Sequence, residues 1–408
     1  MGLQGLRILW ISFAAILFLS SCVMAAERIR VLLLVEDCRI DNLRRFFDPD
    51  PSIAYKVVVT RDGRLSDSEL VKLIRQYFPR NYEDFRGYDA LLLAKPNYEL
   101  FTPKQDRWIH DAILDGAGGI NDGSVFSQIP MIPQSWSSGM AWQAFPNDAP
   151  TVVDQHGGWA PVLAYSVEIN EAHPEPILTM FVPFGVEKVL SRQVSRLVVP
   201  RVGSSTLAWQ VGNYPRKEPY LVAWEYGSGR AMTVGGLIPG GWLSYPTGVT
   251  GQNKYSPEIL MNILYWLSDT PLIDDVEVVH MVKTDLSEFR ERVMVLFSLI
   301  DFIDKFGANT DAVQDDMIAL EEVYEEAAGH YIEHSFSDSE AVITSALSRL
   351  PGVESLARRE KDRALLWVYL IEWLVSASAL FISGFVLWSL MVRRRLYSDV
   401  EATRLRQF

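Results

Sequence analysis

The stretch RIRVLLLVED, Arg28 to Asp37, decides how the first part of the chain folds. An unbroken aliphatic run, Val31 to Val35, ends in two acidic residues. A short apolar run of this kind is typical of a strand buried on both faces of a parallel sheet. The run YDALLLA at 88–94 has the same character and predicts a second such strand.

Helical and strand-like segments alternate around these two runs, which predicts an α/β domain with an open parallel sheet and right-handed crossovers. Between 125 and 218 the pattern predicts loops and short antiparallel strands. A hairpin follows at 219–235, where GSG separates two strand-like runs. The remaining elements that we expect are helices at 40–47, 66–77, 104–114 and 257–267, and strands at 55–60 and within 116–124.

Near the C-terminus, Leu365 to Val392 reads LLWVYLIEWLVSASALFISGFVLWSLMV, with Glu372 as its one ionisable residue. About 20 apolar residues suffice to cross a bilayer as a helix. The basic triplet 393–395 follows at once and predicts a cytoplasmic C-terminal tail. The sequence therefore predicts a single-pass protein whose larger, N-terminal part lies outside the cytoplasm.

The N-terminus has the layout of a secretory signal, because Arg7 precedes a short apolar run and then small residues. Two alternatives stay open: lipid attachment at Cys22 in a lipoprotein-like box, or ordinary cleavage near Ala25. The resulting division is a signal peptide (1–26), an α/β domain (27–275), a helical stalk (276–360), a transmembrane helix (361–395) and a cytoplasmic tail (396–408). Within the stalk we expect helices at 284–306, 311–334 and 338–350, with a break at Pro351-Gly352.

Composition limits the possible partners. The formal charge is −13, and the basic tail makes the remainder more acidic still. An acidic ectodomain argues against nucleic acid as a partner. With two cysteines and six histidines that lack metal-site spacing, we expect no metal and no cofactor.

Several segments together resemble the class I glutamine amidotransferase-like superfamily, in its membrane-associated and ThuA-like branch. They are VLLLVED, YDALLLAKP, GGIND, YLVAWEYGSGRAMTVGG and NILYWL, spread over Arg28 to Leu267. The resemblance implies a flavodoxin-like sheet with helices on both faces. It also implies a cysteine nucleophile on the turn after the GGIND strand, but that turn ends in Ser124 and contains no cysteine. We therefore expect a pseudoenzyme rather than a glutamine-hydrolysing enzyme.

Weaker catalytic candidates are Ser124 as a hydroxyl nucleophile, with His156 or His173 as its base, and Glu175 from the pattern His173-Pro-Glu175. A turn is the plainer interpretation of that pattern. In open α/β sheets, ligands bind beyond the carboxyl ends of the strands. This rule selects four ligand-binding candidates, Asp37, Asn97, Asp122 and Ser124.

The leading hypothesis is a membrane-anchored extracytoplasmic interaction module, a noncatalytic subunit of a cell-envelope complex whose partners are other membrane or envelope proteins. Glu372 lies about two turns inside the outer boundary of the span, where a carboxylate is costly unless it is paired or snorkels to the headgroups. It is therefore the candidate for contact with a partner within the membrane. The alternative is a surface carbohydrate-binding protein or a hydrolase that uses the strand-end crevice.

Overall fold

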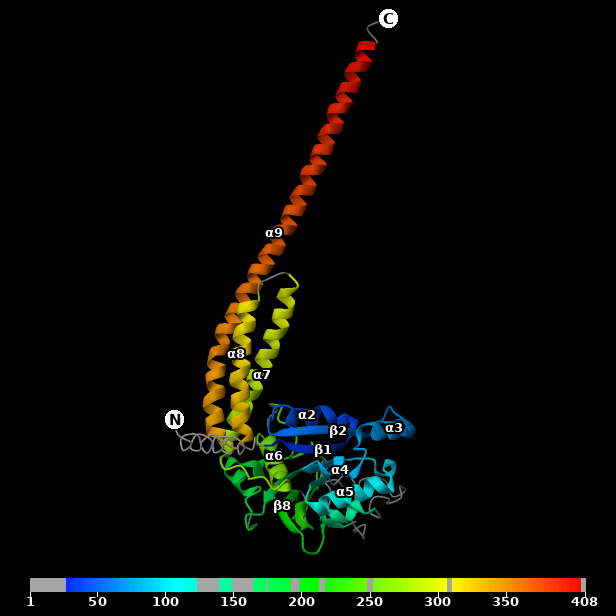
Figure 1. Cartoon of the computed structure of the whole chain (residues 1–408), viewed down its shortest axis with the longest axis vertical. Coiled ribbons are helices and arrows are strands. Elements are labelled where there is room, and N and C mark those ends of the chain that lie inside the picture. Colours follow the sequence, from blue (N-terminus) through cyan, green and yellow to red (C-terminus); the bar gives the residue numbers. More distant parts are fainter. Residues whose placement is uncertain are drawn as a thin grey trace, which may run out of the picture. The chain divides into compact units, whose positions relative to one another are not determined.

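The computed structural model describes residues 27–122, 139–148, 164–173, 175–191, 198–212, 217–247, 252–306 and 310–404. The chain forms two compact units. The first comprises Met1–Leu286 with Glu326–Ala341, and the second comprises Ser287–Glu325 with Val342–Phe408. The sheet and its helices belong to the first unit (Figure 1).

An eight-stranded mixed sheet forms the centre of the first unit, in the order β2-β1-β3-β4-β10-β9-β8-β6. The strands from β2 to β10 run parallel to one another, and β9, β8 and β6 continue the sheet in antiparallel fashion. The predicted α/β class is confirmed, although the sheet is mixed rather than wholly parallel. The strand bounds are β1 Ile29–Glu36, β2 Ile53–Arg61, β3 Ala90–Ala94, β4 Gly118–Asp122, β6 Tyr165–Ile169, β8 Ser205–Gly212, β9 Glu218–Tyr226 and β10 Gly229–Val234.

Side chains of the parallel strands alternate between two buried faces. One face carries Leu32 and Leu34 of β1, and on it pack α3, α4 and α5. The other carries Tyr55 of β2, whose ring meets Phe47 of α2. Figure 1 shows α2 on one side of β1 and β2, and α4 and α5 on the other. The helix bounds are α2 Ile40–Phe47, α3 Asp67–Tyr77, α4 Tyr82–Arg86, α5 Pro103–Asp115 and α6 Ser256–Leu267.

Two adjacent glycines let helices approach β4 closely from both faces. A Cβ on Gly118 would lie 2.5 Å from Cβ of Leu267 in α6, and a Cβ on Gly119 would lie 2.6 Å from Cδ1 of Ile113 in α5. Consecutive strand residues point to opposite faces, so the two helices lie on opposite sides of β4. The GG of the GGIND segment is therefore explained by helix packing on both faces.

The predicted helix starts are also confirmed. Ser66 caps α3 and Thr102 caps α5, each within a reciprocal capping box, with Glu69 and Gln105 as the third helical residues. The short antiparallel strands expected in the middle of the chain are present as β6, β8 and a separate pair, β5 Asn147–Asp148 with β7 Val199–Pro200. Short 3₁₀ segments connect these parts: η1 Asp37–Arg39, η2 Tyr98–Leu100, η4 Ala141–Ala144, η5 Thr179–Phe184 and η6 Val186–Lys188.

Three long helices follow, α7 Val276–Asp304, α8 Asp311–Ile332 and α9 Phe336–Arg404. The predicted break at Pro351-Gly352 is wrong, because α9 continues through both residues. A proline removes one backbone donor from a helix. Leu350 and Val353 on either side are buried, and their packing holds the helix together across the missing hydrogen bond.

We predict that Gly118→Ala lowers the free energy of unfolding by about 1–3 kcal/mol, the usual cost of forcing an extra carbon into a packed interior. The measurement is a urea titration of the detergent-solubilised chain followed by Trp fluorescence. Gly63→Ala is the matched control, because nothing lies within 4 Å of a Cβ at Gly63. Equal effects of the two substitutions would contradict this account of β4.

Candidate functional site

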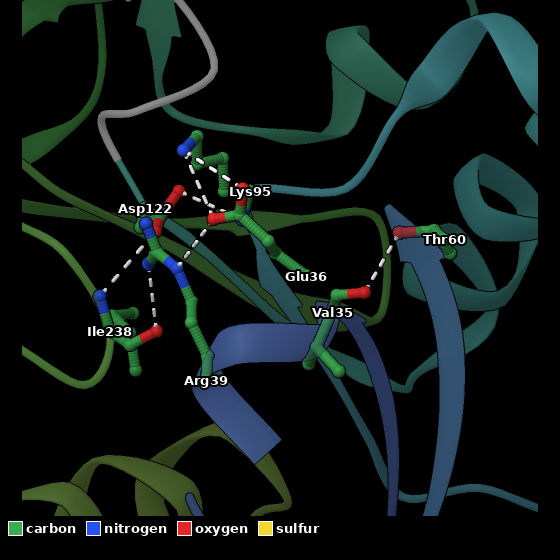
Figure 2. A network of polar contacts seen from close by, with 7 residues as sticks. All are labelled: Val35, Glu36, Arg39, Thr60, Lys95, Asp122 and Ile238. Atoms are coloured by element: carbon green, nitrogen blue, oxygen red, sulfur yellow. Dashed lines mark hydrogen bonds and ion pairs between the residues drawn. The ribbon is translucent and has the colours of Figure 1, made fainter. Parts of the chain in front are cut away.

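The carboxyl ends of β1, β3, β4 and β10 meet at one edge of the sheet, where four charged side chains form a connected cluster (Figure 2). We call it the strand-end cluster. It comprises Glu36 at the end of β1, Arg39 in η1, Lys95 after β3 and Asp122 at the end of β4. The chain after β10 joins it through the backbone of Ile238.

Asp122 lies at the centre of the strand-end cluster and its side chain is fully buried. Its Oδ2 accepts a hydrogen bond from Nη1 of Arg39 at 2.6 Å and from the backbone N–H of Ile238 at 3.4 Å. The same Arg39 nitrogen also donates to the carbonyl oxygen of Ile238 at 3.1 Å. The Arg39 side chain is only 8% exposed, so a charge-assisted hydrogen bond away from water joins β4 to the turn after β1.

Lys95 occupies the left-handed region of backbone conformation, with φ 54°. Its backbone N–H donates to Oδ1 of Asp122 at 3.2 Å, while its ammonium donates to Oε1 of Glu36 at 3.1 Å. A non-glycine residue in this conformation costs about 1 kcal/mol or more, and it persists only where the surroundings fix it. Here the carboxylates of Asp122 and Glu36 hold Lys95 in this conformation.

Glu36 connects the two cations. Its Oε2 accepts from Nε of Arg39 at 3.4 Å and lies 3.0 Å from Nζ of Lys95. Burial alone would raise the pKa of Glu36, but the hydrogen bond and charge of Lys95, with the charges of Arg39 and Arg61, hold the pKa below its ordinary value of 4.5. The pairing of β1 with β2 shifts register between Val35 and Glu36. At this point the Val35 carbonyl accepts a hydrogen bond from the Thr60 hydroxyl at 3.1 Å.

The strand-end cluster balances its own charge, with two carboxylates against two cations. Every carboxylate oxygen in it accepts a hydrogen bond from a group of the chain itself. Such a network fixes the relative positions of strand ends, and it carries no excess charge to attract an ionic ligand. Its geometry is that of a structural lock.

Two of the ligand-binding candidates besides Asp122 lie at this edge with local roles. Asp37 begins η1 and is half-buried. Asn97 caps η2, its side chain accepting from the backbone N–H of Glu99 at 3.3 Å. Ser124 falls outside the described residues, as do His156 and Cys22.

His173 and Glu175 form a local turn, in which the backbone N–H of Glu175 donates to Nδ1 of His173 at 3.2 Å. The Glu175 carboxylate accepts from the indole of Trp266, near the C-terminal end of α6. Leu267, the next residue, meets Gly118 at the start of β4, whereas Asp122 ends that strand. The structure therefore places Glu175 at the opposite edge of the sheet from Asp122.

Two tryptophans of the middle part of the chain, Trp142 and Trp242, are part of the core. Trp242 is fully buried and its indole N–H donates to the carbonyl of Val186 at 2.9 Å. Trp142 is 4% exposed. Among the residues that the structure describes, no group of three or more His, Cys, Asp or Glu side chains is arranged to hold a metal ion.

A second buried ion pair lies within the first unit. Asp50 accepts from Nζ of Lys283 in α7 at 2.9 Å, and from the backbone N–H and hydroxyl of Ser52. Tyr331 of α8 lies against the same carboxylate, at 3.5 Å, and burial, with the nearby charge of Asp50, raises its pKa well above 10. This pair fastens the first part of α7 and the last part of α8 to the loop between α2 and β2.

Sequence reasoning missed Glu36, Arg39 and Lys95. Glu36 is the last residue of β1 and Lys95 directly follows β3, so the strand-end rule that selected Asp37 and Asn97 would have found both, one and two residues earlier. Arg39 gave no signal, because nothing local distinguishes a buried arginine from a surface one. Its burial depends on Asp122, 83 residues away.

Comparison with known proteins assigns no family. No known protein family matches the chain, and no curated protein sequence matches it. Among solved structures, the cytoplasmic proteins STM1381 and STM3548 of Salmonella typhimurium share 14% and 13% identity with it, with TM-scores of 0.41 and 0.39. Both matches cover 58% of this chain, and 99% and 98% of those chains. The GH42 β-galactosidase Gan42B has a TM-score of 0.30 at 10% identity, over 60% of this chain and 31% of that enzyme.

We predict that Arg39→Met lowers the free energy of unfolding by about 3–5 kcal/mol, since it leaves the Asp122 charge buried without its cation. Lys217→Met is the control, because the Lys217–Glu168 pair is about half exposed, and exposed pairs contribute about 0–1 kcal/mol. Urea titration of both variants and the parent chain measures the difference. A loss at Arg39 no larger than that at Lys217 would disprove the structural lock.

We also predict that Glu36 makes stability depend on pH. Its pKa is lower in the folded state than the ordinary value of 4.5, so its contribution is fully present above that value and is lost as the pH falls through the folded-state pKa. Melting temperatures recorded from neutral pH down to about pH 3 should fall less steeply for Glu36→Gln than for the parent. Glu99→Gln, at an exposed position, should follow the parent. Parallel curves for all three proteins would count against the ion pairs of Glu36.

Proposed function

We propose that the protein is a noncatalytic interaction subunit of a cell-envelope complex, anchored by α9 in a membrane and carrying its α/β unit outside the cytoplasm. The observation that carries the proposal is the apolar surface of α9. One 18-residue window has a mean hydropathy of 2.0, and none of it is buried. Trp373, Leu380 and Phe381 are 77%, 75% and 80% exposed.

A hydrocarbon environment accounts for this surface better than water does. Soluble proteins rarely expose apolar patches larger than a few hundred Å². The segment 365–392 is longer than the roughly 20 residues that cross a bilayer, and it presents large apolar side chains on all sides. The basic triplet 393–395 directly after it supports a cytoplasmic location for the tail.

The sheet supports an amidotransferase-like, flavodoxin-like head. Its five parallel strands follow the order second, first, third, fourth, fifth along the chain, which is the order of flavodoxin-like folds. The turn after β4 has no cysteine, and Cys38 follows β1 instead. With the strand-end carboxylates engaged by the chain's own cations, binding to partners is the function that this head supports best.

Co-purification from native membranes tests the proposal directly. We expect a tagged full-length chain to leave the membrane only in detergent and to carry partner proteins with it in fixed proportion. Recovery as a lone monomer, or without detergent, would overturn the proposal. Ser124→Ala tests the hydrolase alternative, since it removes the candidate nucleophile and leaves the strand-end cluster intact, and loss of a hydrolytic phenotype with intact partners would favour an enzyme.

We further predict that Glu372→Leu reduces the recovery of partners severalfold while the protein stays in the membrane. A carboxylate inside the span costs about 2.5–3.5 kcal/mol at the centre of the bilayer, and a partner that pairs with it removes this cost. Ser378→Leu is the control, a polar-to-apolar change in the same helix without loss of charge. Unchanged recovery in the Glu372 variant would leave the helix as an anchor only.

A further inference from the structure

The second half of α7 exposes an apolar stripe that no described residue covers. On its packed side, Val293, Leu296, Ile300 and Ile303 are buried. Beside this packed side, the stripe consists of Val295, Leu299 and Phe302 of α7 and of Phe306, two residues beyond its end, which follow one another at intervals of three or four residues. Three of these four side chains are 68%, 44% and 40% exposed, and Leu299 is half-buried.

The two phenylalanines form the end of the stripe, where α7 gives way to the connection to α8. Their rings meet edge to face, with centroids 5.0 Å apart. A lone exposed apolar residue needs no explanation, but an aligned apolar row on a helix is typical of a surface that is covered in the working protein.

The height of this stripe relative to the apolar part of α9 follows from contacts within the second unit. Arg292 of α7 pairs with Glu354 of α9, Nη2 to Oε1, at 2.8 Å. The two helices run in the same direction, because α8 returns the chain between them. At about 1.5 Å per residue, Phe302 lies level with Ala364, and Phe306 follows the last residue of α7 by two positions.

The burial of side chains along α9 independently shows where the packed part of this helix ends. Ala357 and Ala364 are buried, and beyond Ala364 no described side chain of α9 is buried. Packing against the other two helices therefore ends at the residue before the apolar run 365–392. The charged run RREKDR at 358–363 lies just below that level.

We infer that the C-terminal end of α7 enters the headgroup region of the outer leaflet, with Phe302 and Phe306 inserted between lipids. The inference rests on the proposed membrane anchor, because the height of the bilayer is set by the apolar run of α9. The headgroup zone is about 5–8 Å thick on each side of the hydrocarbon core.

Lipid fits the stripe better than a protein partner does, because the stripe runs up to the level at which α9 becomes apolar and so continues the hydrophobic surface of the span. The neighbouring ionic groups suit a headgroup layer as well. Asp301 and Lys305 pair with each other at 2.8 Å on the exposed side of α7. The hairpin thus becomes a second, shallow membrane contact beside the helix that crosses.

Depth-dependent fluorescence quenching tests this contact on the full-length chain. The cysteines at 22 and 38 are first replaced by serine. Single cysteines are then introduced by Met294→Cys, Phe302→Cys and Phe306→Cys, labelled with an environment-sensitive dye, and reconstituted into phosphatidylcholine vesicles. We expect nitroxide lipids spin-labelled at the headgroup to remove most of the emission at 306, less at 302 and least at 294.

Two further positions make the outcome decisive. Glu322→Cys places the dye on α8, about 16 Å below Asp311 by helical rise, and it should stay unquenched. Trp373→Cys places it inside the apolar run, where lipids labelled in the acyl chain should quench it. Quenching at 373 without any excess at 302 and 306 over 322 would overturn the hairpin contact and leave the anchor standing. No quenching at 373 would overturn the anchor itself.

A protein partner gives a different result. If a second copy or another subunit covers the stripe, the dyes at 302 and 306 should show blue-shifted emission already in detergent and should resist the lipid quenchers. That outcome would also overturn the lipid contact. Quenching that rises steadily from 294 through 302 to 306 is the pattern that supports it.

Discussion

The first unit depends on a carboxylate that has no access to water. Asp122 ends β4 with its side chain fully buried, and an isolated charge in that position would cost several kcal/mol. Arg39, the backbone of Lys95 and the backbone of Ile238 together supply its hydrogen bonds. These groups come from three other segments, so the hydrogen bonds that they donate form only when the ends of β1, β3 and β10 are in place beside β4. It therefore reports on correct assembly of the sheet as well as holding it.

In open α/β sheets, ligands bind beyond the carboxyl ends of the strands, so the position of the strand-end cluster also bears on function. A site that serves a ligand keeps polar groups unengaged until the ligand arrives. Here Glu36 and Asp122 already accept hydrogen bonds from the chain's own cations. Next to Asp122, the buried side-chain amide of Asn121 has no hydrogen-bond partner within the described ranges. Its amide lies one residue inside the edge, within the strand.

Local patterns predicted the elements of this fold well. The runs at Val31–Val35 and 88–94 became buried strands, and Ser66 and Thr102 began their helices, because each signal acts over a few residues. The interactions that close the molecule could not be predicted in this way. Arg39 pairs with Asp122, which is 83 residues away in the sequence, and Lys283 pairs with Asp50, which is 233 residues away. A pattern of neighbouring residues cannot predict contacts at such separations. The strand-end rule selected Asp122, but it could not predict that the chain's own cations pair with this carboxylate.

Pro351 also shows that local patterns cannot predict the effect of tertiary packing. A proline followed by glycine predicts the end of a helix on local grounds, yet α9 continues because buried residues on both sides of the pair pack within the bundle. An uninterrupted helix matters for the proposed role, because it couples the level at which the bundle ends to the level at which the apolar run begins. In the proposed arrangement, a continuous α9 keeps the C-terminal end of α7 at one height, so that a stripe only a few residues long would match the thin headgroup layer.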